Sequence, residues 1–158
     1  MTGASLPAGR LAGVDYGRRR IGVAVCDSLR MLASPLCVRE TASDQEADAA
    51  FFRKLAADEE IVGFVVGLPI HADGRPSDMS REVERFAAWL GRVTELPVAF
   101  HDERYTSREA AGLLAGSGLS RDRKKQRADA VAAQVILASW LERSAAGGTD
   151  RRPGALEG

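Results

Sequence analysis

The first forty residues show the short-period alternation of apolar and polar positions that is typical of strands. Two apolar runs, Leu11–Tyr16 and Arg20–Asp27, are separated by a short polar turn that begins at Gly17. Glycine can supply the positive φ of a hairpin turn, so the two runs predict a β-hairpin. Leu32–Arg39 predicts a third strand, in which Pro35 favours an edge or bulge position. Three strands with short connections predict an antiparallel meander.

The period changes after this meander. Between Asp44 and Glu59 apolar residues recur at spacings of three and four, which predicts a helix. The continuous apolar run Ile61–Gly67 predicts a strand that is buried on both faces. Helical spacing returns from Ser77 to Val93, and Leu96–His101 predicts another short strand.

The last part of the chain predicts two more helices, over Ser107–Leu114 and from the basic segment Arg121–Arg127 to about Arg143. Strands that alternate with helices imply parallel strands joined by right-handed crossovers. We therefore expect an α/β fold with a mixed five-stranded sheet, three antiparallel strands and then parallel ones, and helices on both faces. Residues 10–143 would form one domain, between a flexible tail at 1–9 and a disordered tail at 144–158.

Composition narrows the class of protein. The 158 residues carry 22 basic and 22 acidic side chains, so the net charge gives no sign of nucleic-acid binding. A neutral protein can still bind nucleic acid through a local basic patch. The two cysteines and two histidines form no zinc pattern, and buried free thiols fit a reducing cytoplasm. No apolar run reaches the roughly 18 residues of a membrane helix, and the start of the chain lacks the pattern of a signal peptide. We expect a cytoplasmic protein without a membrane partner.

Acidic residues stand at positions where strands and a helix could bring them together. Asp15 interrupts an apolar run, and burying its charge without a partner would cost several kcal/mol, on the order of 2–7 for a polar group alone. Asp102 and Glu103 follow the last predicted strand. Asp129 lies among alanines, which would let its helix pack close to the sheet. Converging carboxylates repel one another unless a divalent cation neutralises them, so the pattern predicts metal-dependent phosphodiester hydrolysis.

Each of these acids also has a purely structural explanation. Asp15 alone can cap a turn, and Asp102 or Glu103 can pair with Arg104 or cap the following helix. Asp129 alone can be a solvated helix residue that pairs with a nearby base. The conjunction of all of them favours a site more strongly than any single member does.

Basic side chains that could hold a phosphate backbone accompany these acids. One cluster follows Asp15 in the turn, and another precedes Asp129. The histidines His71 and His101 are expected at the surface or in loops rather than as metal ligands. The candidate phosphate contacts are Arg18, Arg20, Arg104, Arg123, Lys124 and Lys125.

Four segments of the chain resemble the motifs of the YqgF/RuvX family. Val14–Asp27 is similar to its first motif, a strand-turn-strand that reads Asp-x-Gly-x-x-Arg-Ile-Gly-x-Ala. The other three follow in the family's order and spacing over residues 10–143, and a departure is Cys26, where serine or threonine is common. They are Val65–Pro69 with Asp73, Gly74 and Ser77, then Asp102–Ser107, then Asp129–Ala133.

The resemblance implies an RNase H-like fold with an acidic site that binds Mg²⁺ or Mn²⁺. Asp15, Glu103 and Asp129 would be its catalytic and metal-binding residues, with Asp102 adjacent and without an assigned role. The family is described as Holliday junction resolvases and as cytoplasmic nucleases that mature the 5′ end of pre-16S ribosomal RNA. The expected partner is therefore nucleic acid, either ribosomal RNA precursor or branched DNA, bound by a monomer or a homodimer.

Two other classes of function compete with the nuclease. A non-catalytic RNA-binding assembly factor would use the same basic residues without any need for Asp15 as a carboxylate. An ATP-binding phosphotransferase is suggested because the Asp-x-Gly turn also resembles the phosphate loop of the actin and sugar-kinase superfamily. Such proteins clamp the nucleotide between two lobes, and 158 residues supply only one.

Overall fold

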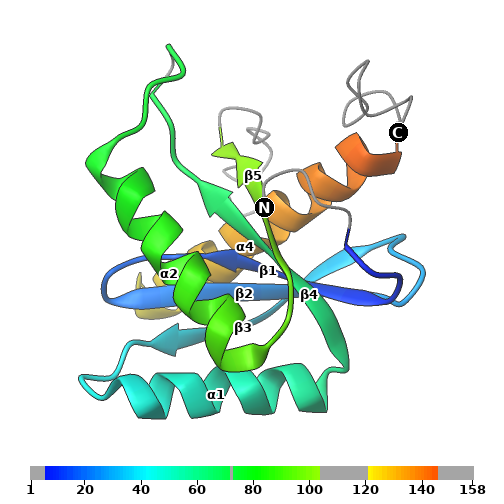
Figure 1. Ribbon diagram of the computed structural model, residues 1–158, viewed down its shortest axis with the longest axis horizontal. Coiled ribbons are helices and arrows are strands. Elements are labelled where there is room, and N and C mark those ends of the chain that lie inside the picture. The colour runs from blue at the N-terminus through cyan, green and yellow to red at the C-terminus, as the bar shows by residue number, and fades with distance from the viewer. Residues whose placement is uncertain (1–5, 72, 104–120, 146–158) are drawn as a thin grey trace.

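A mixed five-stranded sheet forms the centre of the molecule (Figure 1). The computed structural model describes residues 6–71, 73–103 and 121–145, with the backbone alone for 121–127. The strand order is β3-β2-β1-β4-β5, in which the first three strands pair antiparallel and β4 and β5 join in parallel. This arrangement confirms the predicted α/β fold. The strands are β1 Arg10–Asp15, β2 Arg20–Cys26, β3 Ala33–Glu40, β4 Ile61–Leu68 and β5 Val98–Asp102.

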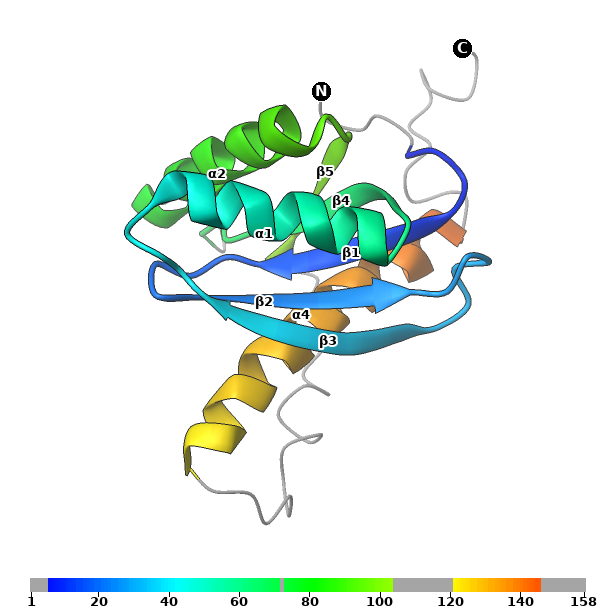
Figure 2. The same ribbon diagram turned by 90° about the horizontal axis from the view of Figure 1, so that it is seen from below.

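Helices cover both faces of the sheet, as expected. Figure 2 shows α1 (Gln45–Asp58) and α2 (Asp78–Thr94) on one side of the strands and α4 (Arg121–Ala145) on the other. The basic segment Arg121–Arg127, which was expected to lead into the last helix, forms its first turns, because Arg, Lys and Gln are good helix formers. The predicted helix over Ser107–Leu114 lies outside the described residues, as do residues 1–5 and 146–158 of the two predicted tails.

Strand β3 is an edge strand, and it carries a bulge. The register between β2 and β3 shifts between Val23 and Ala24, whose partners are Cys37 and Pro35. Proline cannot donate to a strand ladder, so it is confined to edges and bulges. Both positions expected for Pro35 are therefore found together.

Two hydrophobic layers hold the helices to the sheet. On the side of α1 and α2 the core is centred on Val14, Phe52 and Phe64. On the side of α4 it contains Leu11 and Leu137, with Leu6 from the predicted N-terminal tail buried beside them. Alternation along β1 therefore sends Leu11, Gly13 and Asp15 toward α4 and their neighbours toward α1 and α2. Among the helices that the structure describes, none is long and apolar enough to span a bilayer.

Glycines on neighbouring strands let α4 lie very close to the sheet. A Cβ at Gly22 would stand 2.0 Å from the carbonyl oxygen of Asp129, and one at Gly13 would stand 2.7 Å from the Cβ of Leu137. Real Cβ atoms do not approach other atoms so closely, so these positions need glycine because of the close approach of the helix. The glycines thus determine how near Asp129 comes to the strand ends.

Helix α2 begins with a capping box. The Ser77 hydroxyl accepts a hydrogen bond of 2.9 Å from the Ser80 amide, and the Ser80 hydroxyl accepts one of 2.7 Å from the Ser77 amide. We expect Ser77→Ala to lower the free energy of unfolding by about 1 kcal/mol, because an amide at the start of the helix loses its acceptor. Urea denaturation measures this change. Ser43→Ala, at an exposed loop position, is the control and should stay within about 0.5 kcal/mol of the parent; equal losses in both variants would contradict the cap.

Candidate active site

Asp15 is the last residue of β1 and lies between two glycines of the neighbouring strands. Its register partner on β2 is Gly22, and on β4 the residue after the Val14–Val66 pair is Gly67. Because neither neighbour has a side chain, the Asp15 side chain is flanked by α4 rather than by side chains of the adjacent strands. The sequence predicted Asp15 as the first acid of the site, and this position at a strand end suits that role.

Glu103 reaches the same place from β5. A Cβ at Gly67 would lie 2.7 Å from Oε2 of Glu103, so the Glu103 carboxylate stands directly over Gly67, beside Asp15. On β5, Ala99 and His101 are buried on the α4 side, and the alternation assigns Asp102 to the opposite face. The spacing in the sequence does not show which of these adjacent acids belongs to the site. In the structure they lie on opposite faces of the sheet, and Glu103 is on the face of Asp15.

Asp129 completes the set from α4. Its carbonyl oxygen packs over Gly22, and its side-chain Oδ2 accepts a hydrogen bond of 2.9 Å from Nε of Arg20. Arg20 and Gly22 lie on the same face of β2, two residues apart, which explains why the arginine meets the helix there. The two side chains are 28% and 29% exposed, so a ligand could reach the pair from solvent.

The electrostatics of the site are those of uncompensated negative charge. Burial, and after it the charges of Glu103 and Asp129, raise the pKa of Asp15 from 3.8 to about 7. The pKa of Glu103 is also raised, first by burial and then by the charge of Asp102. Arg20 neutralises Asp129 only in part, since Asp129 still acts on Asp15. Repulsion among carboxylates of this kind is relieved when a cation binds between them.

The donors fit a hard divalent cation. All three groups are carboxylates, and oxygen ligands are those that Mg²⁺ and Mn²⁺ select. Within the described part of the chain, no three Asp, Glu, His or Cys side chains stand close enough together to form a ready metal site. The structure therefore brings Asp15 and Glu103 together and holds Asp129 within electrostatic reach, paired with Arg20.

The predicted phosphate contacts divide into three groups. Arg20 lies at the carboxylates, as expected. Arg18 points to the other layer, where its Nε donates to Oε1 of Glu82 on α2 at 2.9 Å, so it does not join the acidic cluster. Arg104 lies outside the described residues, and Arg123, Lys124 and Lys125 belong to the first turns of α4, where the structure describes no side chains.

His101 is a buried residue that the sequence interpretation missed. It was expected at the surface or in a loop, yet it is only 2% exposed, because β5 continues to Asp102 and the neighbouring Gly67 leaves room for the ring. Burial, with the charge of Arg143, lowers the pKa of His101 to about 4, so it is neutral at pH 7. The period-two run Ala99, His101, Glu103 was the signal that could have revealed it.

Comparison with known proteins identifies relatives over most of this chain. The family described as "RuvX: Holliday junction resolvase" matches residues 9–143. A Rhodopirellula baltica protein named "Putative pre-16S rRNA nuclease" is 53% identical over 134 residues, which cover 85% of this chain and 77% of that protein. A protein of the same name from Dechloromonas aromatica is 41% identical over 134 residues, 85% of this chain and 91% of that one.

Solved structures share the fold. The structure of T. thermophilus RuvC in complex with a Holliday junction substrate has a TM-score of 0.53 at 18% identity and covers 89% of this chain and 97% of that chain. Thermus thermophilus RuvC alone has a TM-score of 0.52 at 16% identity, covering 85% and 96%. This likeness confirms the RNase H-like architecture. Because the family match spans nearly all of the domain and relatives exceed 40% identity, the chain belongs to the RuvX (YqgF) family.

Proposed function

We propose that this RuvX-family chain is a metal-dependent endonuclease that processes the 5′ end of pre-16S ribosomal RNA. The observation that carries the proposal is the partly buried carboxylate of Asp15 at the end of β1, whose pKa of about 7 reflects burial and the nearby charges of Glu103 and Asp129. Like charges of this kind destabilise the free protein, and carboxylates with strongly raised pKa values are common at functional sites, which supports the proposal of a cation and a reaction here. Hydrolysis of phosphodiester bonds is the activity that its family and relatives share.

Asp15 and Glu103 would hold the metal ion, and Asp129 would complete the ligand set. A Mg²⁺ or Mn²⁺ ion held by these carboxylates would supply Lewis-acid chemistry, activating a water and stabilising a leaving oxygen. Arg20, which pairs with Asp129, would be the basic side chain that meets the substrate. In the free protein it forms an ion pair with Asp129, and with substrate its guanidinium would hold a phosphate next to the scissile bond.

Two substrates have support of different weight. The relatives at 53% and 41% identity are named for pre-16S rRNA, which favours the RNA. The family description and the RuvC complex favour branched DNA as the second candidate. A junction needs two symmetric cuts and hence a homodimer, whereas one 5′ end needs one site, which a monomer supplies. We place this activity in the cytoplasm, where ribosomal RNA precursors are made and processed in bacteria.

Cleavage assays on both substrates test the proposal. The purified protein should cut a pre-16S RNA fragment with Mg²⁺ or Mn²⁺ and not with EDTA. Glu103→Gln should lower the cleavage rate at least about a hundredfold, because loss of even an outer partner of a metal site costs about 10- to 100-fold. The matched control is Glu40→Gln at the exposed end of β3, which should cut at the parent rate.

Three results would contradict parts of this assignment. Cutting in EDTA, or parent activity in Glu103→Gln, would overturn the metal site. Faster cutting of a four-way junction by a dimer would replace RNA with branched DNA as the substrate. Tight binding of the RNA fragment without cleavage under any metal would replace the nuclease with an assembly factor.

A further inference from the structure

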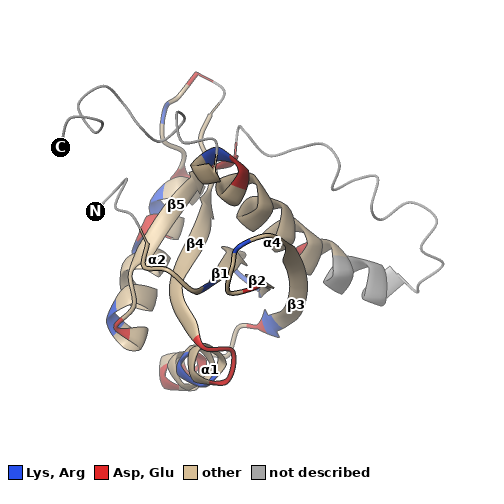
Figure 3. Cartoon of the chain, turned by 90° about the vertical axis from the view of Figure 1, so that its right-hand side faces the viewer, with Lys and Arg blue, Asp and Glu red and all other residues tan. Residues whose placement is uncertain are grey.

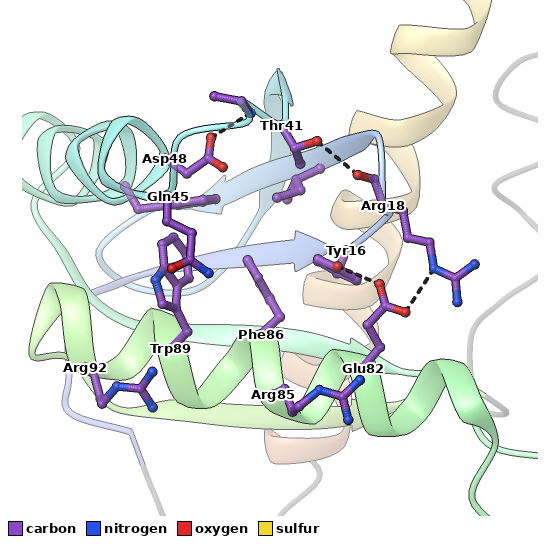
Figure 4. Close-up of a pocket in the computed structure, with 13 residues that line it drawn as sticks. Tyr16, Arg18, Thr41, Gln45, Asp48, Glu82, Arg85, Phe86, Trp89 and Arg92 are labelled. Atoms are coloured by element: carbon purple, nitrogen blue, oxygen red, sulfur yellow. Dashed lines mark hydrogen bonds and ion pairs between the residues drawn. The ribbon is translucent and has the colours of Figure 1, made fainter.

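A second candidate site lies on the opposite side of the sheet from the carboxylates. It is a groove of about 530 Å³ that lies between α1, α2 and the loop that follows β3 (Figure 4). Asp15 points toward α4, and the next residue, Tyr16, points into this groove, so the sheet separates the two sites. None of the three carboxylates lines it. The groove is lined chiefly by Tyr16, Gln45, Arg85, Phe86, Trp89 and Arg92.

The floor of the groove is aromatic. The ring of Phe86 lies 5.8 Å from that of Trp89 and 4.7 Å from that of Tyr16, measured between centroids. Trp89 also meets the fully buried Phe52 edge-on, which holds the indole in place from below. Trp89 and Phe86 are only partly buried, so this rigid aromatic surface is open toward the groove. Figure 4 shows Gln45 of α1 facing Trp89 from the other wall.

Two arginines flank the aromatic floor. Arg85 and Arg92 are exposed, lie seven residues apart on α2, and so occupy the same side of the helix with Trp89 between them. Neither forms an ion pair within the described part of the chain, although Arg85 acts electrostatically on Glu82. Seven residues at a rise of about 1.5 Å place their backbones about 10 Å apart along the helix.

The acids of the groove already have partners. Oε2 of Glu82 accepts from the Tyr16 hydroxyl at 2.8 Å, and Oε1 accepts from Arg18 at 2.9 Å. These bonds, that of Tyr16 first, lower the pKa of Glu82 and keep it ionised. Asp48 accepts from Arg39 at 3.1 Å and from the Ala42 amide at 3.1 Å. Among the residues that the structure describes, the groove arginines without an ion pair are therefore Arg85 and Arg92.

We propose that this groove binds an unpaired nucleotide of the nucleic-acid strand. The base would stack on Trp89, the Gln45 amide would offer a donor and an acceptor to its edge, and Arg85 and Arg92 would contact the phosphates on either side. This inference rests on the proposed nuclease function, and it places part of the substrate on the face away from the cut. Figure 3 shows basic and acidic residues interspersed on α1 and α2, so a local cluster must supply the binding.

The chemistry favours a nucleotide over an acidic peptide. An acidic peptide would use the two arginines but has no need of a partly exposed tryptophan with an amide opposite it. A nucleotide presents a flat base that can stack on the tryptophan and phosphates that can pair with the arginines.

Tryptophan fluorescence tests the groove without any cleavage. The chain has two tryptophans, so Trp140→Phe leaves Trp89 as the single reporter. In EDTA, an oligouridylate of eight nucleotides should quench Trp89 saturably. Arg85→Ala with Arg92→Ala should weaken binding at least about tenfold and reduce the slope of log Kd against log salt by about 1.4, since each phosphate contact on a single strand contributes about 0.7.

The matched control is Arg81→Ala on the same helix, which pairs with Asp78 outside the groove and should bind as the parent does. Anisotropy of labelled oligouridylate in the natural Trp140 background gives a second measurement if the tryptophan variant fails to fold. Parent affinity in the double arginine variant would overturn the proposal. Equal quenching by an oligoglutamate peptide of the same length would also overturn it, in favour of an acidic protein partner.

The experiments can contradict the groove proposal and the nuclease proposal independently of each other. If Asp15→Asn cuts RNA like the parent while the groove variants lose oligonucleotide binding, the nuclease site is misassigned and the groove stands. If Asp15→Asn is inactive while the groove variants bind normally, the groove is misassigned and the nuclease site stands.

Discussion

Replacing Asp15 with asparagine is expected to abolish RNA cleavage and, in the absence of metal at pH 8, to make the protein more stable than the parent. Cleavage is lost because the amide cannot hold a divalent cation as a carboxylate does. Stability is gained because the variant no longer places a charge in a partly buried position beside Glu103 and Asp129. Both effects follow if the Asp15 carboxylate is needed for metal binding but destabilises the metal-free protein.

The pH dependence of this gain follows from the pKa of Asp15. In the folded chain the pKa is raised from 3.8 to about 7, so between these values the native state binds more protons than the unfolded state. The stability of the parent therefore falls as pH rises through this window, by as much as about 4 kcal/mol for a shift of this size. Asp15→Asn does not titrate, so its advantage should be absent at pH 4 and complete by pH 8.

Urea denaturation in EDTA at pH 4, 6 and 8 measures the effect. Mg²⁺ should stabilise the parent at pH 8 and stabilise Asp15→Asn much less, because ligand binding to the native state adds to its stability. Asp73→Asn is the matched control: this exposed aspartate has a lowered pKa through the Arg75 amide, so its replacement brings no gain at pH 8. If the difference in the free energy of unfolding between the parent and Asp15→Asn is the same at all three pH values, the charge of Asp15 does not destabilise the folded protein.

Gly22→Ala is expected to lower the free energy of unfolding by at least about 3 kcal/mol. The new Cβ would stand 2.0 Å from the carbonyl oxygen and 2.5 Å from the carbonyl carbon of Asp129. These are backbone atoms, so only a shift of the whole of α4 could relieve the overlap. Such a shift would also move Asp129 away from Arg20 and from Asp15, and cleavage should fall with stability.

The control for this prediction is another glycine in regular structure. Gly91 lies in α2, where a Cβ would have its nearest contacts at 3.5 and 3.6 Å, in ordinary van der Waals range. Gly91→Ala should therefore be neutral or stabilise the protein by about 0.5–1 kcal/mol through helix propensity. Thermal and urea unfolding compare the two. Equal stability of Gly22→Ala and the parent would mean that α4 does not rest on the sheet at this glycine.

Much of the fold was predictable because its signals are local. The alternation in β1 and β2, the apolar run of β4 and the helical spacing of α1 and α2 each arise from neighbours in the sequence, and each element begins within about two residues of its expected place. Pro35 marked the edge strand for an equally local reason, since a missing N–H cannot join a ladder from the inside. The order of these elements was enough to predict the mixed sheet.

The composition of the site was predictable in part. Asp15 ends β1 and Glu103 follows β5, as their positions beside apolar runs indicated, and the structure brings both to Gly67 on the strand β4 between them. Arg18 and Arg20 looked alike in the sequence, yet one bonds Glu82 on α2 and the other bonds Asp129 on α4. Arg18 lies in the turn before β2 and is not bound by strand alternation, whereas Arg20 is the first residue of the strand, and a basic turn does not reveal where the strand begins.

The sequence by itself determined the order of the described strands and helices and the family motifs, and it named the candidate acids. Only the tertiary structure decided that Glu103 rather than Asp102 shares the face of Asp15, that His101 is buried, and that Trp89 lies between Arg85 and Arg92 across the sheet. The physical reason is that periodicity is a property of adjacent residues, whereas the face, the register and the burial of a side chain depend on segments that lie up to a hundred residues away in the chain.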